Sequence, residues 1–177
     1  MDPLKLDRPG NKSVAVIGAG ACGICAAKTM LEAGFSVTVF EAGSEIGGMW
    51  CYENDNGLSS AYNTLHINTS RKVTRFSDLD FDDDTQHFPD HRDMHRYLVK
   101  YADNFGVTPH IQFNTPVLSV EPLTDTTAAS QFTPGVLVVP NTDSTAGSAP
   151  RWRITTNNGA YEFDTCLLYT SPSPRDS

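Results

Sequence analysis

The 177-residue sequence predicts an α/β fold built around a parallel sheet. An apolar run at 13–17 is followed by a glycine-rich turn, by helix-forming residues at 21–33 and by a second apolar run at 36–40. This order is typical of a βαβ unit, because two parallel strands need a long crossover connection that is usually a helix. Gly34 stands where a helix C-terminus needs a residue with positive φ.

The turn after the first apolar run has the pattern G-x-G-x-x-G. Gly18 permits a tight turn, Gly20 lets the backbone approach a pyrophosphate, and Gly23 lets the helix pack closely on the strand. The N-terminus of the helix adds unpaired N–H groups and the positive end of its dipole. A coincidental glycine-rich turn is disfavoured because strand, turn and helix occur in register. We therefore predict a Rossmann-like dinucleotide site formed by Gly18, Ala19, Gly20, Ala21, Cys22 and Gly23.

Glu41 ends the second apolar run, near the spacing at which a carboxylate accepts hydrogen bonds from a ribose diol. A carboxylate there disfavours a 2′-phosphate, because two anions would face each other. The predicted ligand of this site is therefore FAD or NAD rather than NADP.

Three later segments distinguish these ligands. Gly47-Gly48-Met49-Trp50 follows Glu41, residues 62–70 read YNTLHINTS, and Phe76-Ser77-Asp78 comes after them. In order and spacing these elements resemble the flavin-containing monooxygenases, over about residues 12–165. The related Baeyer–Villiger monooxygenases share most of the same elements.

The resemblance implies that the glycine turn holds the FAD pyrophosphate and that Glu41 holds the adenosine ribose. It places further cofactor contacts beside the flavin and the nicotinamide of NADPH, at Gly48, Met49, Trp50, Ile67, Asn68 and Thr69. Asn68 is the candidate catalytic contact, because its amide offers a donor and an acceptor to a polar ring edge. From the residues alone, Trp50 also fits a core aromatic and Asn68 also fits a turn.

The activity that the resemblance implies is reduction of bound FAD by NADPH, followed by O2-dependent oxygenation of a soft nitrogen or sulfur nucleophile of a small molecule. The alternatives are a Baeyer–Villiger-type monooxygenase, another FAD or NAD oxidoreductase, and a non-catalytic nucleotide-binding module. We predict an incomplete FAD-binding domain at 12–165, with a β-meander insertion, truncated before the NADPH-binding domain. By itself this fragment is not expected to turn over substrate.

The C-terminal residues 166–177 depart from the resembled family. One permitted set of codons for residues 166–176 resembles a transposase adapter used in short-read library preparation. We therefore predict that 166–177 is a non-native tail and that the strand closing the first sheet is lost. The alternative is a genuine tail rich in proline and serine.

Composition narrows the other function classes. The net charge of −8 and the pI near 4.9 disfavour a nucleic-acid partner. No apolar stretch reaches membrane length, and residues 1–8 lack the apolar core of a secretion signal. These features predict a cytoplasmic protein without a membrane segment.

A helix is predicted from 90 or 91 to about 104, with Asp90 as N-cap and Gly106 ending it. The histidines near it are expected on a solvated face, and no metal site is predicted, because a set of convergent ligands is not evident; they are His87, His91 and His95. The acidic run at 82–84 is expected to be a solvated loop.

Cys22 and Cys25 form a C-x-x-C pattern, but small buried thiols are favoured over a redox pair. Five short β-like segments are predicted after the helix, at 111–113, 117–120, 136–139, 152–155 and 161–163. Asn157-Asn158-Gly159 is expected to be a hairpin turn. A long loop is expected between Pro122 and Pro150, because threonine, serine, alanine, proline and glycine dominate there.

Overall fold

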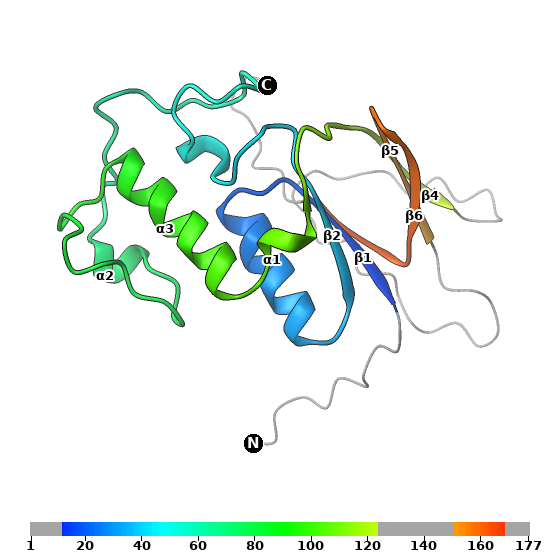
Figure 1. Ribbon diagram of the computed structural model, residues 1–177, viewed down its shortest axis with the longest axis horizontal. Coiled ribbons are helices and arrows are strands. Elements are labelled where there is room, and N and C mark those ends of the chain that lie inside the picture. The colour runs from blue at the N-terminus through cyan, green and yellow to red at the C-terminus, as the bar shows by residue number, and fades with distance from the viewer. Residues whose placement is uncertain (1–11, 124–150, 169–177) are drawn as a thin grey trace.

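A computed structural model describes residues 12–123 and 151–168 (Figure 1). Four parallel strands form the central sheet in the order β3-β2-β1-β7. They are β1 (Ser13–Ile17), β2 (Ser36–Phe40), β3 (Ile111–Gln112) and β7 (Thr165–Leu168). Helix α1 (Ala21–Glu32) joins β1 to β2 and is followed by Gly34, whose φ is 88°. The predicted βαβ unit is confirmed.

A second sheet of three antiparallel strands has the order β4-β5-β6. Its strands are β4 (Val117–Leu123), β5 (Arg151–Thr156) and β6 (Gly159–Phe163). The predicted hairpin turn at 157–159 is confirmed, since β5 and β6 pair directly across it. The predicted strand at 136–139 and most of the predicted loop lie outside the described residues.

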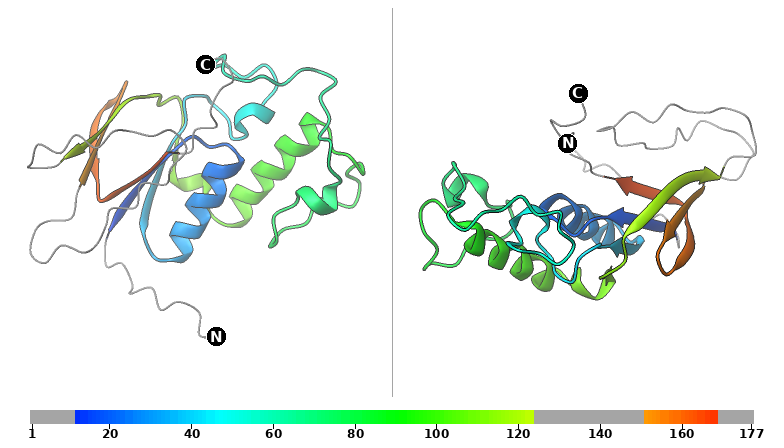
Figure 2. Two further views of the ribbon diagram at one scale, coloured as in Figure 1. Left: turned by 180° about the vertical axis from the view of Figure 1, so that it is seen from behind. Right: turned by 90° about the horizontal axis from the view of Figure 1, so that it is seen from above.

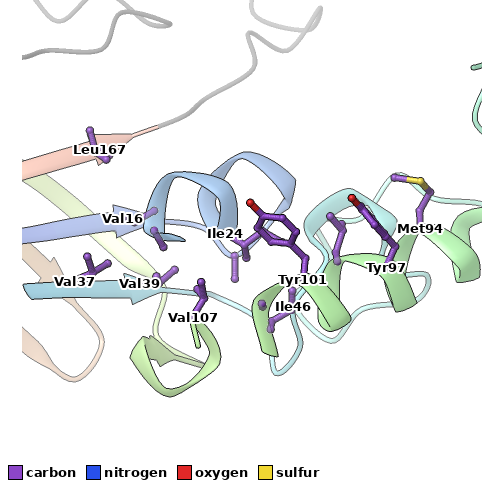
Figure 3. Close-up of a cluster of buried hydrophobic side chains, with 14 of the residues drawn as sticks. Val16, Ile24, Val37, Val39, Ile46, Met94, Tyr97, Tyr101, Val107 and Leu167 are labelled. Atoms are coloured by element: carbon purple, nitrogen blue, oxygen red, sulfur yellow. The ribbon is translucent and has the colours of Figure 1, made fainter. Parts of the chain in front are cut away.

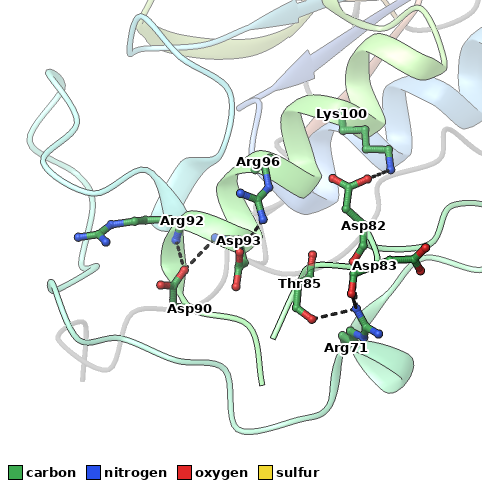
Figure 4. Close-up of polar contacts among 9 residues, drawn as sticks. All are labelled: Arg71, Asp82, Asp83, Thr85, Asp90, Arg92, Asp93, Arg96 and Lys100. Atoms are coloured by element: carbon green, nitrogen blue, oxygen red, sulfur yellow. Dashed lines mark hydrogen bonds and ion pairs between the residues drawn. The ribbon is translucent and has the colours of Figure 1, made fainter. Parts of the chain in front are cut away.

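The remaining elements are helical: η1 (Gly48–Trp50), α2 (Arg71–Thr74), α3 (His91–Asn104) and η2 (Thr108–His110). Asp90 is the N-cap of α3, and one of its carboxylate oxygens accepts from the N–H groups of Arg92 and Asp93, both at 2.9 Å (Figure 4). Burial acts to raise the pKa of Asp90, but these backbone donors outweigh it and the pKa is lowered. Within the described ranges, no helix is long and apolar enough to cross a membrane.

The structure has three layers, with α1 and α3 on one face of the parallel sheet and β4–β6 on the other (Figures 1 and 2). Alternate residues of β1 and β2 face the helices and join the larger core, which includes Ile24 of α1 and Tyr101 of α3 (Figure 3). The opposite face carries Ala15 and Phe40, which pack against Ile154 and Phe163 of the second sheet. Both faces of the parallel sheet are therefore covered, as such sheets require.

The predicted β-like segment at 111–113 forms β3, which pairs with β2 in the parallel sheet. One prediction about the sheets needs correction. The closing strand is not lost, since β7 runs through Leu168 and pairs in parallel with β1 from Val14 to Ile17. Cys166 and Leu167 are buried in this strand. The non-native origin of residues 166–177 stays a prediction.

Two predictions about exposure were also wrong. His91 is only 2% exposed, although a solvated face was expected, and His95 is partly buried, whereas His87 is exposed. Cys22 is exposed rather than buried, and Cys25 is half-buried.

The acidic run is solvated only in part. Asp83 and Asp84 are exposed, but the Asp82 carboxylate forms an ion pair with Lys100 of α3. Arg71 donates to the backbone carbonyl oxygens of Asp82, Asp83 and Thr85, which holds this loop against α2 (Figure 4).

Candidate functional site: a glycine-lined cavity at the ends of β1 and β2

A cavity of about 380 Å³ opens where β1 and β2 end and α1 begins. This is the edge at which parallel α/β sheets bind ligands, because the chain turns away from the carboxyl ends of neighbouring strands. Four chain segments line it: 17–20, 40–42, 48–58 and 116–117. The lining residues are Ile17, Gly18, Gly20, Phe40, Glu41, Ala42, Gly48, Met49, Asn54, Asn56, Leu58, Pro116 and Val117.

The first turn depends on Gly18 and Gly23. Gly18 has a φ of 92°, a conformation that favours glycine, and its N–H donates to the Phe40 carbonyl oxygen at 2.8 Å. A Cβ on Gly23 would stand 1.9 Å from the Gly18 carbonyl oxygen. Helix α1 can therefore pack this closely on β1 only without a side chain at position 23. No side chain caps α1 at Gly20, so the first N–H groups of the helix have no capping partner from a side chain.

A second glycine turn lies directly against the first. Gly48 has a φ of 54°, and a Cβ on it would come within 3.0 Å of the Gly20 Cα. The Gly47 N–H donates to the Ala19 carbonyl oxygen at 3.0 Å, which fixes the two turns together. The wall between them is therefore bare backbone, which a polyphosphate can approach closely.

Glu41 is 6% exposed, and its carboxylate is hydrogen-bonded to the first turn. Its Oε2 accepts from the Ala19 N–H at 2.7 Å, and its Oε1 accepts from the Gly43 N–H at 2.8 Å and from the Asn56 amide at 3.4 Å. A carboxylate has about four acceptor positions, so one remains for a hydroxyl group. Glu41 thus positions the turn as well as lining the cavity.

The structure brings together only part of the predicted set. Gly18, Gly20, Glu41, Gly48 and Met49 line the cavity. The other members lie elsewhere: Ala19 and Gly23 are buried under the turn, Ala21 is half-buried, and Cys22 is exposed on α1.

The remaining predicted contacts are also outside this cavity. Trp50 packs at the edge of the larger core and lines a different cavity, and Ile67 is partly buried against the same core. Asn68 and Thr69 are exposed, and the Thr69 hydroxyl shares a 2.6 Å hydrogen bond with Thr74.

Sequence reasoning missed the wall opposite the glycines. Asn54, Asn56 and Leu58 come from the loop after η1, and Pro116 and Val117 begin the second sheet. The run Asn54-Asp55-Asn56-Gly57 is a turn signal, but its approach to Glu41 is a long-range contact that local pattern does not specify.

A bare glycine wall, a buried acid after β2 and a helix N-terminus at one sheet edge define a dinucleotide-binding α/β protein. The sequence signature described as "Flavin-binding monooxygenase-like" matches residues 11–148. The chain belongs to this family.

Curated relatives agree with this assignment. Flavin-containing monooxygenase 5 from Oryctolagus cuniculus is 38% identical over 123 residues, which cover 68% of this chain and 23% of the relative. Flavin-containing monooxygenase FMO GS-OX-like 6 from Arabidopsis thaliana is 38% identical over 132 residues, covering 63% and 28%. The chain thus spans about a quarter of the length of these relatives.

Solved structures show the same fold. S-allyl-L-cysteine S-oxygenase from Allium sativum superimposes with a TM-score of 0.67 and 25% identity, covering 92% of this chain and 38% of that one. A cyclohexanone monooxygenase mutant from Rhodococcus sp. Phi1, bound to NADP+, has a TM-score of 0.59 and 23% identity, covering 88% and 25%. At that identity the second likeness concerns the fold alone.

Proposed function

We propose that the complete protein is an FAD- and NADPH-dependent monooxygenase that uses O2 to oxygenate soft nitrogen or sulfur nucleophiles of small molecules. In this proposal the present chain holds the adenosine and pyrophosphate part of FAD. Family membership supports it, together with relatives that are flavin-containing monooxygenases and a structural neighbour that is an S-oxygenase.

The observation that carries the proposal is the approach of Gly48 to Gly20 beside the buried Glu41. Any side chain at Gly48 would reach the Gly20 backbone, so the two turns can meet and present bare backbone to the cavity only with glycine at position 48. Backbone N–H groups at the start of α1 suit a pyrophosphate, and the acceptor position left on the Glu41 carboxylate suits a ribose hydroxyl group. The residues present therefore fit the adenosine diphosphate part of FAD.

The chain's own contribution is binding, orientation and exclusion of water. Gly18, Gly20 and the first N–H groups of α1 hold the pyrophosphate, while Glu41 holds the ribose. Met49, at the mouth of the cavity and 53% exposed, covers the flavin side. When bound, the reduced flavin supplies the activation of O2.

Ile67, Asn68 and Thr69 remain the proposed contacts to the flavin ring and the nicotinamide. Asn68 is exposed, so its amide can offer a donor and an acceptor to a ring edge. Trp50 is proposed to support the flavin-facing turn from the core side, where it packs.

Binding of FAD by the purified chain tests the first part. We expect stoichiometric flavin absorbance after incubation with FAD and desalting, and loss of this flavin in Gly20→Val, whose side chain would enter the cavity. Gly106→Asn is the matched control, because Gly106 has a φ of 67° and open space around it at the far end of α3, and asparagine tolerates this conformation. Equal flavin retention by Gly20→Val and the control contradicts the site.

Activity of the complete protein tests the second part. NADPH oxidation should depend on FAD and O2 and should increase with a thioether or tertiary amine, with the S-oxide or N-oxide as product. Conversion of a ketone to an ester without S- or N-oxide would instead establish the Baeyer–Villiger alternative.

A further inference from the structure

Away from the glycine cavity, a second cluster of polar side chains surrounds the turn η1. Glu45 precedes the turn, Cys51 follows it, and His95 reaches it from the second turn of α3. Their ligand atoms all lie within 4.8 Å of one another, in a cavity of about 230 Å³ that Tyr52 and His91 also line.

The spacing of these atoms matches the geometry of a tetrahedral cation site. The Glu45 carboxylate oxygen lies 3.6 Å from the Cys51 sulfur and 3.4 Å from His95 Nε2. Around Zn²⁺, bonds of about 2.3 Å to sulfur and about 2.0–2.2 Å to nitrogen and oxygen place neighbouring ligands roughly 3.3–3.7 Å apart. Two of the three spacings therefore already match those around a bound metal ion, and the third, between Cys51 and His95, is within 4.8 Å.

Unpartnered nitrogen atoms are the independent sign of a ligand. His95 Nε2 is buried and faces the Glu45 carboxylate, yet it makes no hydrogen bond. His91, one helical turn earlier and 2% exposed, lines the same cavity with its Nε2 also buried and unpartnered. A buried polar atom without a hydrogen-bond partner costs free energy. The two unpartnered histidine nitrogens therefore indicate a bound ligand that the protein itself does not supply.

We propose that Cys51, His95 and Glu45 bind one Zn²⁺ ion, with His91 as hydrogen-bond partner of a water molecule in the fourth position. A thiolate, an imidazole and a carboxylate together form a ligand set that Zn²⁺ accepts. Binding replaces the thiol proton of Cys51 with the metal, and the proton passes to solvent.

At this location a bound ion would stabilise the second glycine turn. His95 packs on Gly47, where a Cβ would come within 2.7 Å of the imidazole carbon Cδ2, and Gly47 donates to Ala19 in the first glycine turn. An ion held from both ends of η1 and from α3 would fix the second glycine turn in place. The proposal does not depend on flavin and can hold or fail separately from the proposed function.

Metal ligands bind in their deprotonated forms, so Zn²⁺ uptake should release a proton at neutral pH and should weaken as the pH falls.

The test is metal titration of the purified full chain after treatment with a chelator. Zn²⁺ should bind stoichiometrically, and Co²⁺ as a spectroscopic substitute should give a thiolate-to-metal charge-transfer band. Cys51→Ser should abolish that band, and His95→Gln should weaken binding about a hundredfold or more, since even loss of an outer-sphere partner costs 10–100-fold. Zn²⁺ should also raise the melting temperature of the unsubstituted chain but not of Cys51→Ser.

Cys25→Ser and His87→Gln are the matched controls, because each removes the same chemical group outside the cluster. His91→Gln should keep the charge-transfer band and change only the affinity. The proposal is overturned if Co²⁺ gives no thiolate band with the unsubstituted chain, or if Cys51→Ser and Cys25→Ser bind metal equally well. In that case the hydrogen bond from Cys51 to Glu45, and not a metal ion, holds these side chains together.

Discussion

Two glycines near the first turn should have different roles: Gly23 in the stability of the fold and Gly20 in the binding of FAD. The variants Gly23→Ala and Gly20→Ala separate these two roles. At position 23 the new Cβ meets the Gly18 carbonyl oxygen at 1.9 Å, more than an ångström inside any real contact. The carbonyl cannot move cheaply, because the Gly18 N–H is bonded to Phe40. Overpacking of this kind costs about 3 kcal/mol, and the better helix propensity of alanine returns up to about 1 kcal/mol. The expected net loss is about 2 kcal/mol.

At Gly20 the same substitution should leave stability nearly unchanged. Its φ of −77° suits alanine, and the new Cβ would lie 3.6 Å from the Gly48 Cα, an ordinary contact. The poorer N-cap and the reduced freedom of the unfolded chain nearly cancel, leaving a change within about 0.5 kcal/mol. FAD affinity should nevertheless fall, since the methyl group covers backbone that lines the cavity at the proposed pyrophosphate position.

Urea unfolding followed by tryptophan fluorescence measures the first effect, and titration with FAD measures the second. Equal unfolding free energies for Gly20→Ala and Gly23→Ala would refute the packing argument. A Gly20→Ala variant that binds FAD as tightly as the unsubstituted chain would refute the proposed pyrophosphate position beside Gly20.

Three further outcomes follow from the polar and thiol groups. Asp90→Ala should lower the free energy of unfolding by about 1 kcal/mol in urea, because it removes the N-cap of α3; an unchanged value would contradict that cap. Backbone and side-chain hydrogen bonds from Ser13 lower the pKa of Asp164, so its contribution to stability is full above about pH 3.9 and is lost as the pH falls through the lower folded value. Asp164→Asn should therefore flatten the acid side of a melting-temperature profile, and an unaltered profile would count against this bond. Burial raises the pKa of Cys166 to about 12, so at neutral pH a thiol reagent should label the exposed Cys22 far faster, and rapid labelling of Cys166 would mean that β7 does not form.

Local signals explain why the sequence predicts the first half of the fold well. Apolar runs, the capping Asp90 and the terminal glycines fix β1, α1, β2 and α3 to within a residue or two. Strand β3 was not predicted in the parallel sheet, because a two-residue strand carries no periodicity and its partner β2 is remote in sequence. Helix periodicity did carry one unused signal: His91 lies three residues before Met94, on the buried stripe itself.

In the candidate site, too, local sequence predicts some residues and long-range packing places the others. Gly18, Gly20 and Glu41 were predictable because their chemistry depends on local spacing along one βαβ unit. The opposite wall depends on how the loop after η1 folds back, and the cluster of Glu45, Cys51 and His95 depends on the packing of α3 against that turn. A local sequence pattern specifies neither of these two arrangements. Exposed side chains such as Asn68 are the least specified, because no packing neighbour fixes them.

Ala19 explains how the cavity keeps its shape. Its N–H donates to Glu41 and its carbonyl oxygen accepts from Gly47, so one residue joins all three segments nearest the proposed pyrophosphate position. Its side chain is fully buried, which explains a small residue at this otherwise variable position of the G-x-G-x-x-G pattern. A larger side chain there would push apart the acid and the second glycine turn together. The proposed ribose-binding and phosphate-binding parts of the cavity are therefore a single packed unit, formed without a ligand.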